Sequence, residues 1–217
     1  MDTRAVTDLQ HKWDKFYLEN PTGYGSGQGS IVNATVYYRR VVESFLDHNR
    51  PQRVLDLGCG DWQFSRFIPW DGYGVSYVGV DASPMIIEKN KQQYSSPTKH
   101  FQVVCQPSEL AALETHFDLV ICKDVLQHIP NATVNGYIDV IERISRVALI
   151  TNDAYPAQEL NDDIEPGGWR AIDIRKPPFS RKSFVIFEYA NFTDKQYWIK
   201  HVHLLPGRES GCVDKIR

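Results

Sequence analysis

The sequence predicts an α/β fold in which a mostly parallel sheet is covered by helices on both faces. Short apolar runs alternate with stretches of helical periodicity, and the first run ends in a glycine-rich turn. Strands that alternate with helices pair in parallel, because each helix returns the chain to the same edge of the sheet. Two later apolar runs lack a helix-length connection, which predicts an antiparallel pair at one edge of the sheet.

The expected elements follow from this periodicity. The strands are expected at 53–57, 77–81, 101–105, 117–122 and 147–151, with the edge pair at 183–188 and 197–204. Helices are expected over 31–49, 84–94 and 134–144. Pro51 stops the first helix, and Ser83 and Pro84 suit the start of the second. The glycine- and proline-rich stretches 20–30 and 161–179 are expected to be loops long enough to act as lids.

The composition favours one soluble domain and excludes several classes of protein. Of the 217 residues, 42% are apolar and 24% are charged, and the formal net charge of −3 disfavours a dedicated nucleic-acid binder. The four cysteines form no Cys-x-x-Cys pair, which indicates neither a zinc ribbon nor a disulfide framework and fits a reducing cytosol. The first residues lack an apolar leader, and no run approaches the roughly 18 apolar residues of a membrane span. We therefore expect a cytoplasmic protein without a membrane partner.

The turn after the first strand carries the strongest signal for a ligand. Gly58 and Gly60 let the backbone turn sharply before a helix whose positive end favours a polar ligand. Gln63 occupies the position where a dinucleotide fingerprint requires a third glycine, which disfavours NAD. Asp81 closes the second strand, 25 positions after Asp56, where this arrangement presents a carboxylate to a ribose. Together they predict a nucleoside cofactor, although a glycine pair alone would indicate only a tight turn.

Three segments resemble motifs of a known family. VLDLGCGDW, YVGVDAS and FDLVICKDVLQHI are similar to motifs I, II and IV of class I S-adenosylmethionine (SAM)-dependent methyltransferases, over about residues 50 to 155. The resemblance implies a Rossmann-like fold with a mostly parallel seven-stranded sheet and an antiparallel edge strand. It implies SAM as cofactor, S-adenosylhomocysteine (SAH) as product, and a single methyltransferase domain over 1–217. Its parts would be a helical lid segment (1–50), a cofactor-binding core (51–155) and a substrate loop with edge strands (156–217).

The resemblance also implies which residues contact the cofactor. The turn would hold the methionine part, Asp81 the ribose and Ala82 one face of the adenine, while Gln106 stands where the family often has an acidic residue. The other expected contacts are Asp56, Gly58, Gly60 and Trp62 in the turn, Pro107 and Lys123 after later strands, and Trp13, Tyr24, Ser26 and Gly27 in the covering segment. A flexible linker is the alternative interpretation of that segment, but its aromatic residues favour a lid.

Candidates for catalysis lie after the fourth and fifth strands. Methyl transfer needs alignment more than a base, but Asp124, His128 and Asp153 could assist a hydroxyl acceptor. His128 is expected one turn after Asp124 on a helix, which would place both on one face. The alternatives are that His128 bonds a loop carbonyl and that Asp153 caps a turn. With Asp162 and Asp163 these carboxylates could ligate magnesium, but spacing alone does not bring them together, and no metal is expected.

Two further groups of side chains are candidate binding residues. Trp169 could stack on a sugar or aromatic ring, and Arg170 and Arg175 could clamp an anionic acceptor, unless this loop only exposes its charges to solvent. His201 and His203 share one face of the expected edge strand, and without a third ligand they are interpreted as ordinary sheet surface.

The sequence thus favours methylation of a small-molecule or glycan acceptor, at an oxygen. One alternative is an NAD-dependent oxidoreductase, and another is a binding subunit that keeps the fold without chemistry. Protein or nucleic-acid methylation is disfavoured, because neither an Asn-Pro-Pro-Tyr-like motif nor a basic aromatic stripe is present. The sequence indicates no particular oligomeric state.

Overall fold

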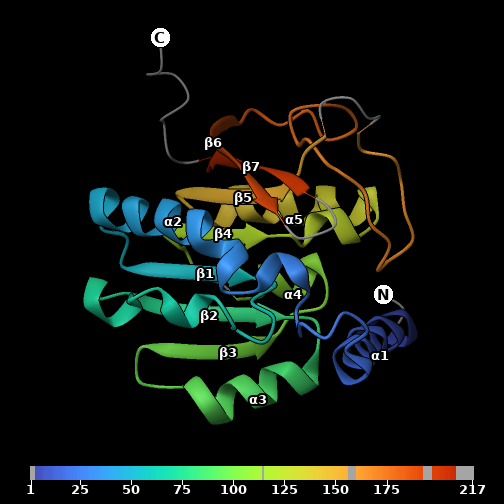
Figure 1. Cartoon of the computed structure of the whole chain (residues 1–217), viewed down its shortest axis with the longest axis horizontal. Coiled ribbons are helices and arrows are strands. Elements are labelled where there is room, and N and C mark those ends of the chain that lie inside the picture. Colours follow the sequence, from blue (N-terminus) through green and yellow to red (C-terminus); the bar gives the residue numbers. More distant parts are fainter. Residues whose placement is uncertain (1–2, 114, 156–159, 193–196, 209–217) are drawn as a thin grey trace. The chain divides into compact units, whose positions relative to one another are not determined.

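The computed structural model describes residues 3–113, 115–155, 160–192 and 197–208 (Figure 1). These residues form two compact units, Met1–Cys105 and Gln106–Arg217, and each is described by itself. The predicted division of one domain into lid, core and substrate parts stays a prediction. Cys212 lies outside the described residues.

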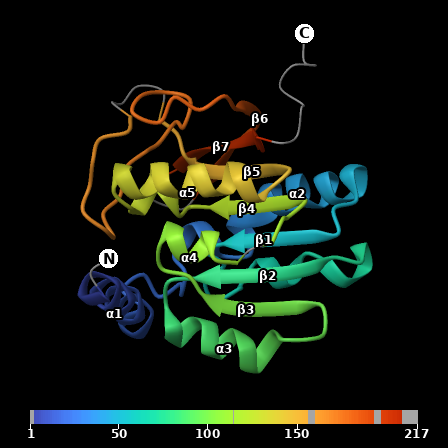
Figure 2. The same cartoon turned by 180° about the vertical axis from the view of Figure 1, so that it is seen from behind.

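The first unit contains three parallel strands, β1 (Arg53–Leu57), β2 (Ser76–Asp81) and β3 (Lys99–Val103). β2 pairs with β1 on one side and with β3 on the other, and the three lie side by side in Figure 2. The carboxyl ends of parallel strands share one edge, so the turn after β1 and Asp81 at the end of β2 are brought together there. All three predicted strands are confirmed, with bounds shifted by at most two residues.

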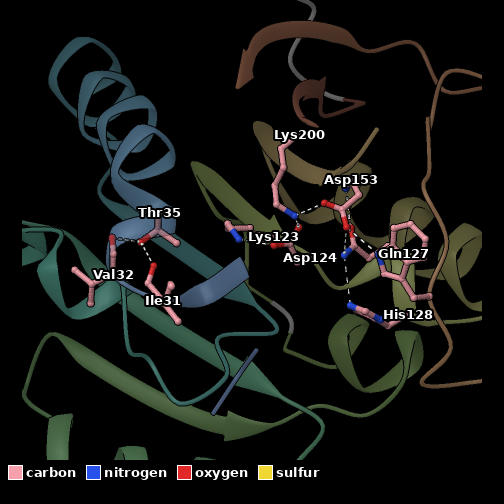
Figure 3. Close-up of polar contacts among 10 residues, drawn as sticks. Ile31, Val32, Thr35, Lys123, Asp124, Gln127, His128, Asp153 and Lys200 are labelled. Atoms are coloured by element: carbon pink, nitrogen blue, oxygen red, sulfur yellow. Dashed lines mark hydrogen bonds and ion pairs between the residues drawn. The ribbon is translucent and has the colours of Figure 1, made fainter. Parts of the chain in front are cut away.

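The helices of the first unit begin and end at residues suited to those positions. The unit has α1 (Thr3–Glu19), α2 (Val36–Asn49), α3 (Pro84–Tyr94) and the short 3-10 helices η1 (Gln28–Ser30), η2 (Asn33–Thr35), η3 (Ser65–Phe67) and η4 (Trp70–Tyr73). Ser83 Oγ accepts from Ile86 N at 3.2 Å, which confirms the predicted cap of α3. α2 begins later than predicted, after η2, and the Thr35 hydroxyl there bonds the carbonyls of Ile31 and Val32, both at 3.0 Å (Figure 3).

The second unit contains four strands, β4 (Leu119–Lys123), β5 (Val147–Asp153), β6 (Phe184–Phe192) and β7 (Tyr197–Pro206). β5 pairs in parallel with β4 and antiparallel with β7, and β7 pairs antiparallel with β6. The predicted antiparallel pair is confirmed. The position of His201 and His203 was predicted wrongly, because β7 lies between β5 and β6 and is not the outer strand of the pair.

The helices of the second unit correct one further prediction. The unit has α4 (Pro107–Ala111), the 3-10 helix η5 (Leu126–His128) and α5 (Asn131–Ile144), whose side chains Val134, Ile138 and Ile141 are buried. The prediction that one helix carries both Asp124 and His128 is wrong. Asp124 has a φ of 58°, a left-handed conformation that a right-handed helix does not contain, and only one 3-10 turn follows before Pro130.

Seven strands are described, three in the first unit and four in the second, and their pairings are mostly parallel. Buried apolar side chains occur in both units, for example Leu55 and Tyr77 in the first and Ile121 and Leu149 in the second. The predicted α/β fold class is confirmed. Within the described residues, no helix is both long enough and apolar enough to span a membrane.

Candidate cofactor and acceptor sites

The turn after β1 is fastened to the neighbouring strand by its backbone. The N–H groups of Gly58 and Cys59 both donate to the carbonyl of Val80, at 2.8 and 3.0 Å. Gly58 and Gly60 have φ angles of 75° and 54°, which L-residues adopt only at a cost in conformational energy. The two glycines are therefore required by the conformation of the turn, as predicted. The helix expected directly after the turn is wrong, because only the 3-10 helices η3 and η4 lie between β1 and β2.

Asp81 joins this turn to the start of α3. Its Oδ2 accepts from Gly60 N and its Oδ1 from Ser83 N, both at 3.0 Å. Burial raises the pKa of Asp81 to about 6, although the backbone N–H groups of Ser83, Gly60 and Ala82 act in the opposite direction. A carboxylate has about four lone-pair positions, so a further hydroxyl can still bind. Asp81 thus fits the ribose contact that the sequence predicts.

The side chains of Asp56 and Trp62 lie beneath the turn. Asp56 accepts from Tyr77 Oη at 2.5 Å and from Ser65 Oγ at 3.3 Å, and Trp62 Nε1 donates to the same Tyr77 oxygen at 2.8 Å. Both residues are buried. They support the turn from inside the unit, and their predicted contact with the cofactor stays a prediction.

The N-terminal segment packs directly on the turn. Ser26 Oγ donates to Asp61 Oδ1 at 2.7 Å and accepts from Asp61 N at 2.9 Å, and Gln63 Nε2 donates to the carbonyl of Tyr24 at 2.8 Å. A Cβ at Gly60 would come within 2.3 Å of Ser26 Oγ. These contacts hold the segment against the glycine turn, where the lid was expected.

Other predicted lid residues lie near these contacts in sequence. Trp13 lies on α1, with its ring edge-on to Phe16 at 6.0 Å, and Gly27 has a φ of 96°. Tyr17 is a neighbour of these contacts that the sequence pattern did not predict as a site residue. Its hydroxyl lies 3.3 Å from Ser26 Oγ, and burial, with Asp81 as the next cause, raises its pKa.

Three of the remaining cofactor candidates, Gln106, Pro107 and Lys123, belong to the second unit, and Ala82 belongs to the first. Gln106 precedes α4 as its N-cap residue, and its Nε2 lies 3.4 Å from Glu109 Oε1. Pro107 occupies the first position of that helix. Ala82 remains in the first unit, between Asp81 and the cap of α3. The predicted adenine contacts of Ala82, Gln106 and Pro107 stay predictions.

A polar cluster lies at the carboxyl ends of β4 and β5. We define the polar cluster as Lys123, Asp124, Gln127, His128, Asp153 and Lys200 (Figure 3). Lys200 was missed by the sequence analysis. It lies directly opposite Asp153 in the β5–β7 register, and its Nζ bonds both Asp153 Oδ1 and Asp124 Oδ1, the latter at 2.8 Å. The available signal was a lysine in the middle of an apolar strand.

The two carboxylates of the polar cluster are neutralised by lysines. Burial would raise the pKa of Asp124, but Lys123 and Lys200 lower it to about 2. Lys123 Nζ lies 2.5 Å from Asp124 Oδ2, and burial lowers the pKa of this lysine. Burial also opposes the charge on Lys200, but Asp124 and Asp153 outweigh it and raise the pKa of Lys200. Asp124 therefore stays ionised near neutral pH and is a poor proton acceptor.

Asp153 is held by three donors. Besides Lys200, its Oδ2 accepts from Gln127 Nε2 at 3.1 Å and from Trp169 Nε1 at 2.8 Å. Its backbone N–H donates to Gln127 Oε1 at 2.8 Å. With its oxygens bonded in this way, Asp153 holds the side chains of Lys200, Gln127 and Trp169 in place.

His128 is oriented by the 161–179 loop. Its Nδ1 lies 2.8 Å from the carbonyl oxygen of Gly168. Because a carbonyl only accepts, Nδ1 carries the hydrogen and Nε2 has the acceptor lone pair, toward which Gln127 Nε2 donates over a long 3.4 Å. Burial lowers the pKa of His128, although the Gly168 carbonyl, Asp124 and Asp153 act to raise it. The imidazole is therefore neutral at neutral pH and able to accept a proton.

The same loop is fastened to η5. Gly167 N donates to the carbonyl of His128 at 2.7 Å, and Arg170 Nη1 donates to the carbonyl of Leu126 at 2.8 Å. Arg170 Nη2 donates to Asn131 Oδ1 at 2.8 Å, and its side chain is buried. The terminal nitrogens of Arg170 are thus used to hold the loop. Its predicted role as an anion clamp stays a prediction.

Arg175 is engaged within its own loop. Its Nε and Nη2 donate to Asp173 at 2.9 and 2.7 Å, as a two-pronged pair. Its side chain is 41% exposed. A contact between Arg175 and an acceptor stays a prediction.

Histidines and carboxylates elsewhere in the second unit bond other side chains. His201 Nε2 lies 2.7 Å from Glu188 Oε2, and His203 Nδ1 lies 3.3 Å from Ser183 Oγ. Asp163 Oδ1 accepts from the backbone of Asn131 at 2.8 Å. No group of three or more His, Cys, Asp or Glu side chains that could hold a metal is found where the structure describes the chain.

A glycine turn followed by a carboxylate at the end of the next parallel strand is typical of α/β domains that bind nucleoside cofactors. Residues 33–192 match a family described as a methyltransferase domain. The match covers more than half of the chain, and the chain belongs to this family. This finding agrees with the predicted resemblance and not with the oxidoreductase alternative.

The chain is also similar to individual methyltransferases. It is 29% identical over 167 residues to the mitochondrial ubiquinone biosynthesis O-methyltransferase of Schizosaccharomyces pombe, an alignment that covers 73% of this chain and 60% of that protein. The SAH-bound magnesium protoporphyrin IX methyltransferase of Synechocystis matches with a TM-score of 0.60 and 20% identity, covering 92% of this chain and 99% of that one.

A third similar protein is the 1,6-didemethyltoxoflavin-N1-methyltransferase of Burkholderia thailandensis, whose structure contains SAH. It has a TM-score of 0.64 and 14% identity, covering 94% of this chain and 88% of that one. These structural likenesses show the Rossmann-like methyltransferase fold that the sequence predicts. The chain spans about 60% of the length of its yeast relative.

Proposed function

We propose that this chain transfers a methyl group from SAM to a hydroxyl oxygen of a small-molecule or glycan acceptor, with His128 as the general base. The observation that carries the choice of oxygen is the hydrogen bond between His128 Nδ1 and the Gly168 carbonyl, which leaves Nε2 as the proton acceptor. Membership of the methyltransferase family supports the donor. The cysteine pattern supports a cytosolic location.

On the donor side, the residues of the first unit fit a nucleoside sulfonium. Asp81 would accept a ribose hydroxyl, and the turn that includes Gly58 and Gly60 would lie against the methionine part. Ser26 and Tyr24 would cover it, because their segment already packs on that turn. SAM, when bound, supplies an electrophilic methyl group.

On the acceptor side, one member of the polar cluster would accept the proton and the others would position side chains. His128 Nε2 would take the hydroxyl proton, which makes the oxygen a better nucleophile. Lys200 bonds both Asp124 and Asp153 and helps to keep Asp124 ionised, so Asp124 does not compete for the proton, while Asp153 positions Gln127 and Trp169. Asp124 and Asp153, predicted as catalytic residues, would thus act as positioning residues.

The experiment that tests the donor is calorimetric titration with SAH. The wild-type protein should bind SAH with micromolar affinity, and Asp81→Ala should weaken binding by about 1.5–3 kcal/mol, the scale of a hydrogen bond to a charged group. Asp47→Ala, at an exposed site on α2, is the control and should leave the affinity unchanged. Absence of SAH binding by the wild-type protein at high micromolar concentration would refute the proposal.

A further inference from the structure

An indole ring stands beside the polar cluster with much of its surface open. Trp169 Nε1 donates to Asp153 Oδ2 at 2.8 Å, yet 47% of the residue is exposed. A hydrogen bond to a buried carboxylate fixes the ring, while the exposed part can cover a ligand. Large exposed aromatic surface that is held rigidly is more typical of a binding surface than of a packed core.

A second ring limits the orientation of the first. Tyr155 lies edge-on to Trp169, with the ring centroids 6.0 Å apart and the planes at 78°. Its hydroxyl donates to the carbonyl of Tyr197, at 3.3 Å, at the start of β7. Trp169 is therefore anchored through Asp153 on β5, and Tyr155 through β7. The two rings form a fixed aromatic wall, defined as Tyr155 and Trp169.

We propose that this aromatic wall is an acceptor subsite that takes a planar aromatic ring carrying the hydroxyl group to be methylated. This inference rests on the proposed function and narrows its acceptor to phenols. A flat ring can lie against an indole face, whereas a puckered saturated ring makes less of that contact.

The chemistry of the base agrees with this choice. Burial lowers the pKa of His128 below its ordinary value of 6.5. A phenolic hydroxyl has a pKa of about 10, and an aliphatic hydroxyl is close to water at about 15.7. A weak base such as His128 therefore assists a phenol far better than an aliphatic alcohol. A phenol combines the more acidic hydroxyl that suits a weak base with a flat ring that can lie against the Trp169 indole.

The step balances without a further reactant. The phenol oxygen forms a bond to the methyl carbon, and its proton passes to His128 Nε2. The electron pair of the broken carbon–sulfur bond stays on sulfur, which gives SAH. The products are an aryl methyl ether, SAH and protonated His128, which returns its proton to solvent.

The test compares an aromatic probe with a saturated probe of the same carbon skeleton and hydroxyl position. Protein saturated with SAH is titrated with 2-naphthol and with its saturated counterpart decahydro-2-naphthol. We expect 2-naphthol to bind at least tenfold more tightly. Trp169→Ala should abolish that preference and Trp169→Phe should keep most of it, because a ring remains. Phe184→Ala is the matched control, since Phe184 is an exposed ring on β6 opposite Leu204.

The outcomes separate the inference from the proposed function. Equal affinity for the two probes, or an unchanged preference in Trp169→Ala, overturns the aromatic subsite even if SAH binds. If the wild-type protein does not bind SAH, the proposed function is wrong, and the inference that rests on it is wrong as well. SAH affinity is measured in every variant. Unchanged SAH affinity in Trp169→Ala, together with a lost preference for 2-naphthol, supports the inference.

Discussion

The Nδ1 atom of His128 lies 2.8 Å from the carbonyl oxygen of Gly168, so the proposed base is oriented by the loop that also supplies Trp169. This bond determines which nitrogen carries hydrogen and which accepts it. The loop is itself fastened to η5 through Gly167 and Arg170. A change in the conformation of this loop would therefore alter the orientation of the base as well as the acceptor surface.

Replacing the base should slow methyl transfer without weakening SAH binding. His128→Gln is expected to lower kcat by about 10²–10⁴-fold, the usual contribution of a general base. In the wild-type protein, kcat/KM for a phenol acceptor should fall as the pH drops through a pKa below 6.5, because the protonated imidazole accepts no proton. His116→Gln, at an exposed site in the same unit, is the control. A full rate in His128→Gln would contradict the assignment.

Removing Lys200 should destabilise the protein strongly. Lys200→Met leaves Asp124 and Asp153 buried without their shared cation, and the loss of one partner from a buried ion pair costs about 3–5 kcal/mol. The free energy of unfolding is measured by chemical denaturation. The exposed Lys182→Met serves as the control, and the double variant Lys200→Met/Asp153→Asn should recover part of the loss. A loss no larger than that of Lys182→Met would argue against the ion-pair role.

Because Asp124 is paired with lysines, it should also make the free energy of unfolding depend on pH in the acid range. The pKa of Asp124 is about 2 in the folded protein, whereas an unperturbed aspartate side chain, as in the unfolded chain, has a pKa of 3.8. A lowered carboxyl pKa contributes stability that is present above pH 3.8 and is lost as the pH falls from 3.8 towards 2. The difference in unfolding free energy between wild type and Asp124→Asn should therefore shrink over that interval. A difference that stays constant from pH 7 to pH 2.5 would show that Asp124 contributes no such pH dependence.

Local patterns predicted the first unit better than the polar cluster. The strand, the glycine turn and the terminal Asp81 follow one another closely along the chain, so each could be predicted from short-range chemistry. Lys200 meets Asp153 only through the β5–β7 register, which depends on where two distant segments pair. No periodicity in either strand specifies that pairing.

Two other features depended on contacts that sequence spacing does not show. Asp124 adopts a left-handed conformation that interrupts the expected helix, although most residues of its type do not. Trp169 reaches Asp153 across a loop without regular secondary structure. The loop was predicted to bind substrate, but its attachment to η5 through Arg170 could not be inferred from its composition.

Cofactor affinity should depend on pH through Asp81. Burial raises the pKa of this carboxyl to about 6, and protonation turns one of its two accepting oxygens into a donor. The dissociation constant of SAH should be constant above pH 6 and rise up to tenfold per pH unit below it. Asp81→Asn should bind more weakly, by about ten- to a hundredfold, with a flat profile. Asp47→Asn is the control, and a pH-dependent Asp81→Asn would assign the titration to another group.

The contact between Gly60 and Ser26 allows a test of the lid that needs no measurement of methyl transfer. A Cβ at Gly60 would lie 2.3 Å from Ser26 Oγ and 3.1 Å from Ser26 Cβ, and Gly60 has a φ of 54°. Gly60→Ala should therefore displace the segment that includes Ser26 and weaken SAH binding by more than tenfold.

The double variant Gly60→Ala/Ser26→Gly separates the two causes. Removing the Ser26 side chain relieves the clash but leaves the left-handed alanine, whose backbone cost is about 1–2 kcal/mol. If the N-terminal segment covers the cofactor, the double variant should recover part of the SAH affinity, and proteolysis within 20–30 should again be slowed by SAH. Ser26→Gly alone is the necessary control, because it also removes the bonds to Asp61. No recovery in the double variant, together with SAH-independent proteolysis of the wild-type segment, would show that the segment contacts the turn without covering the ligand.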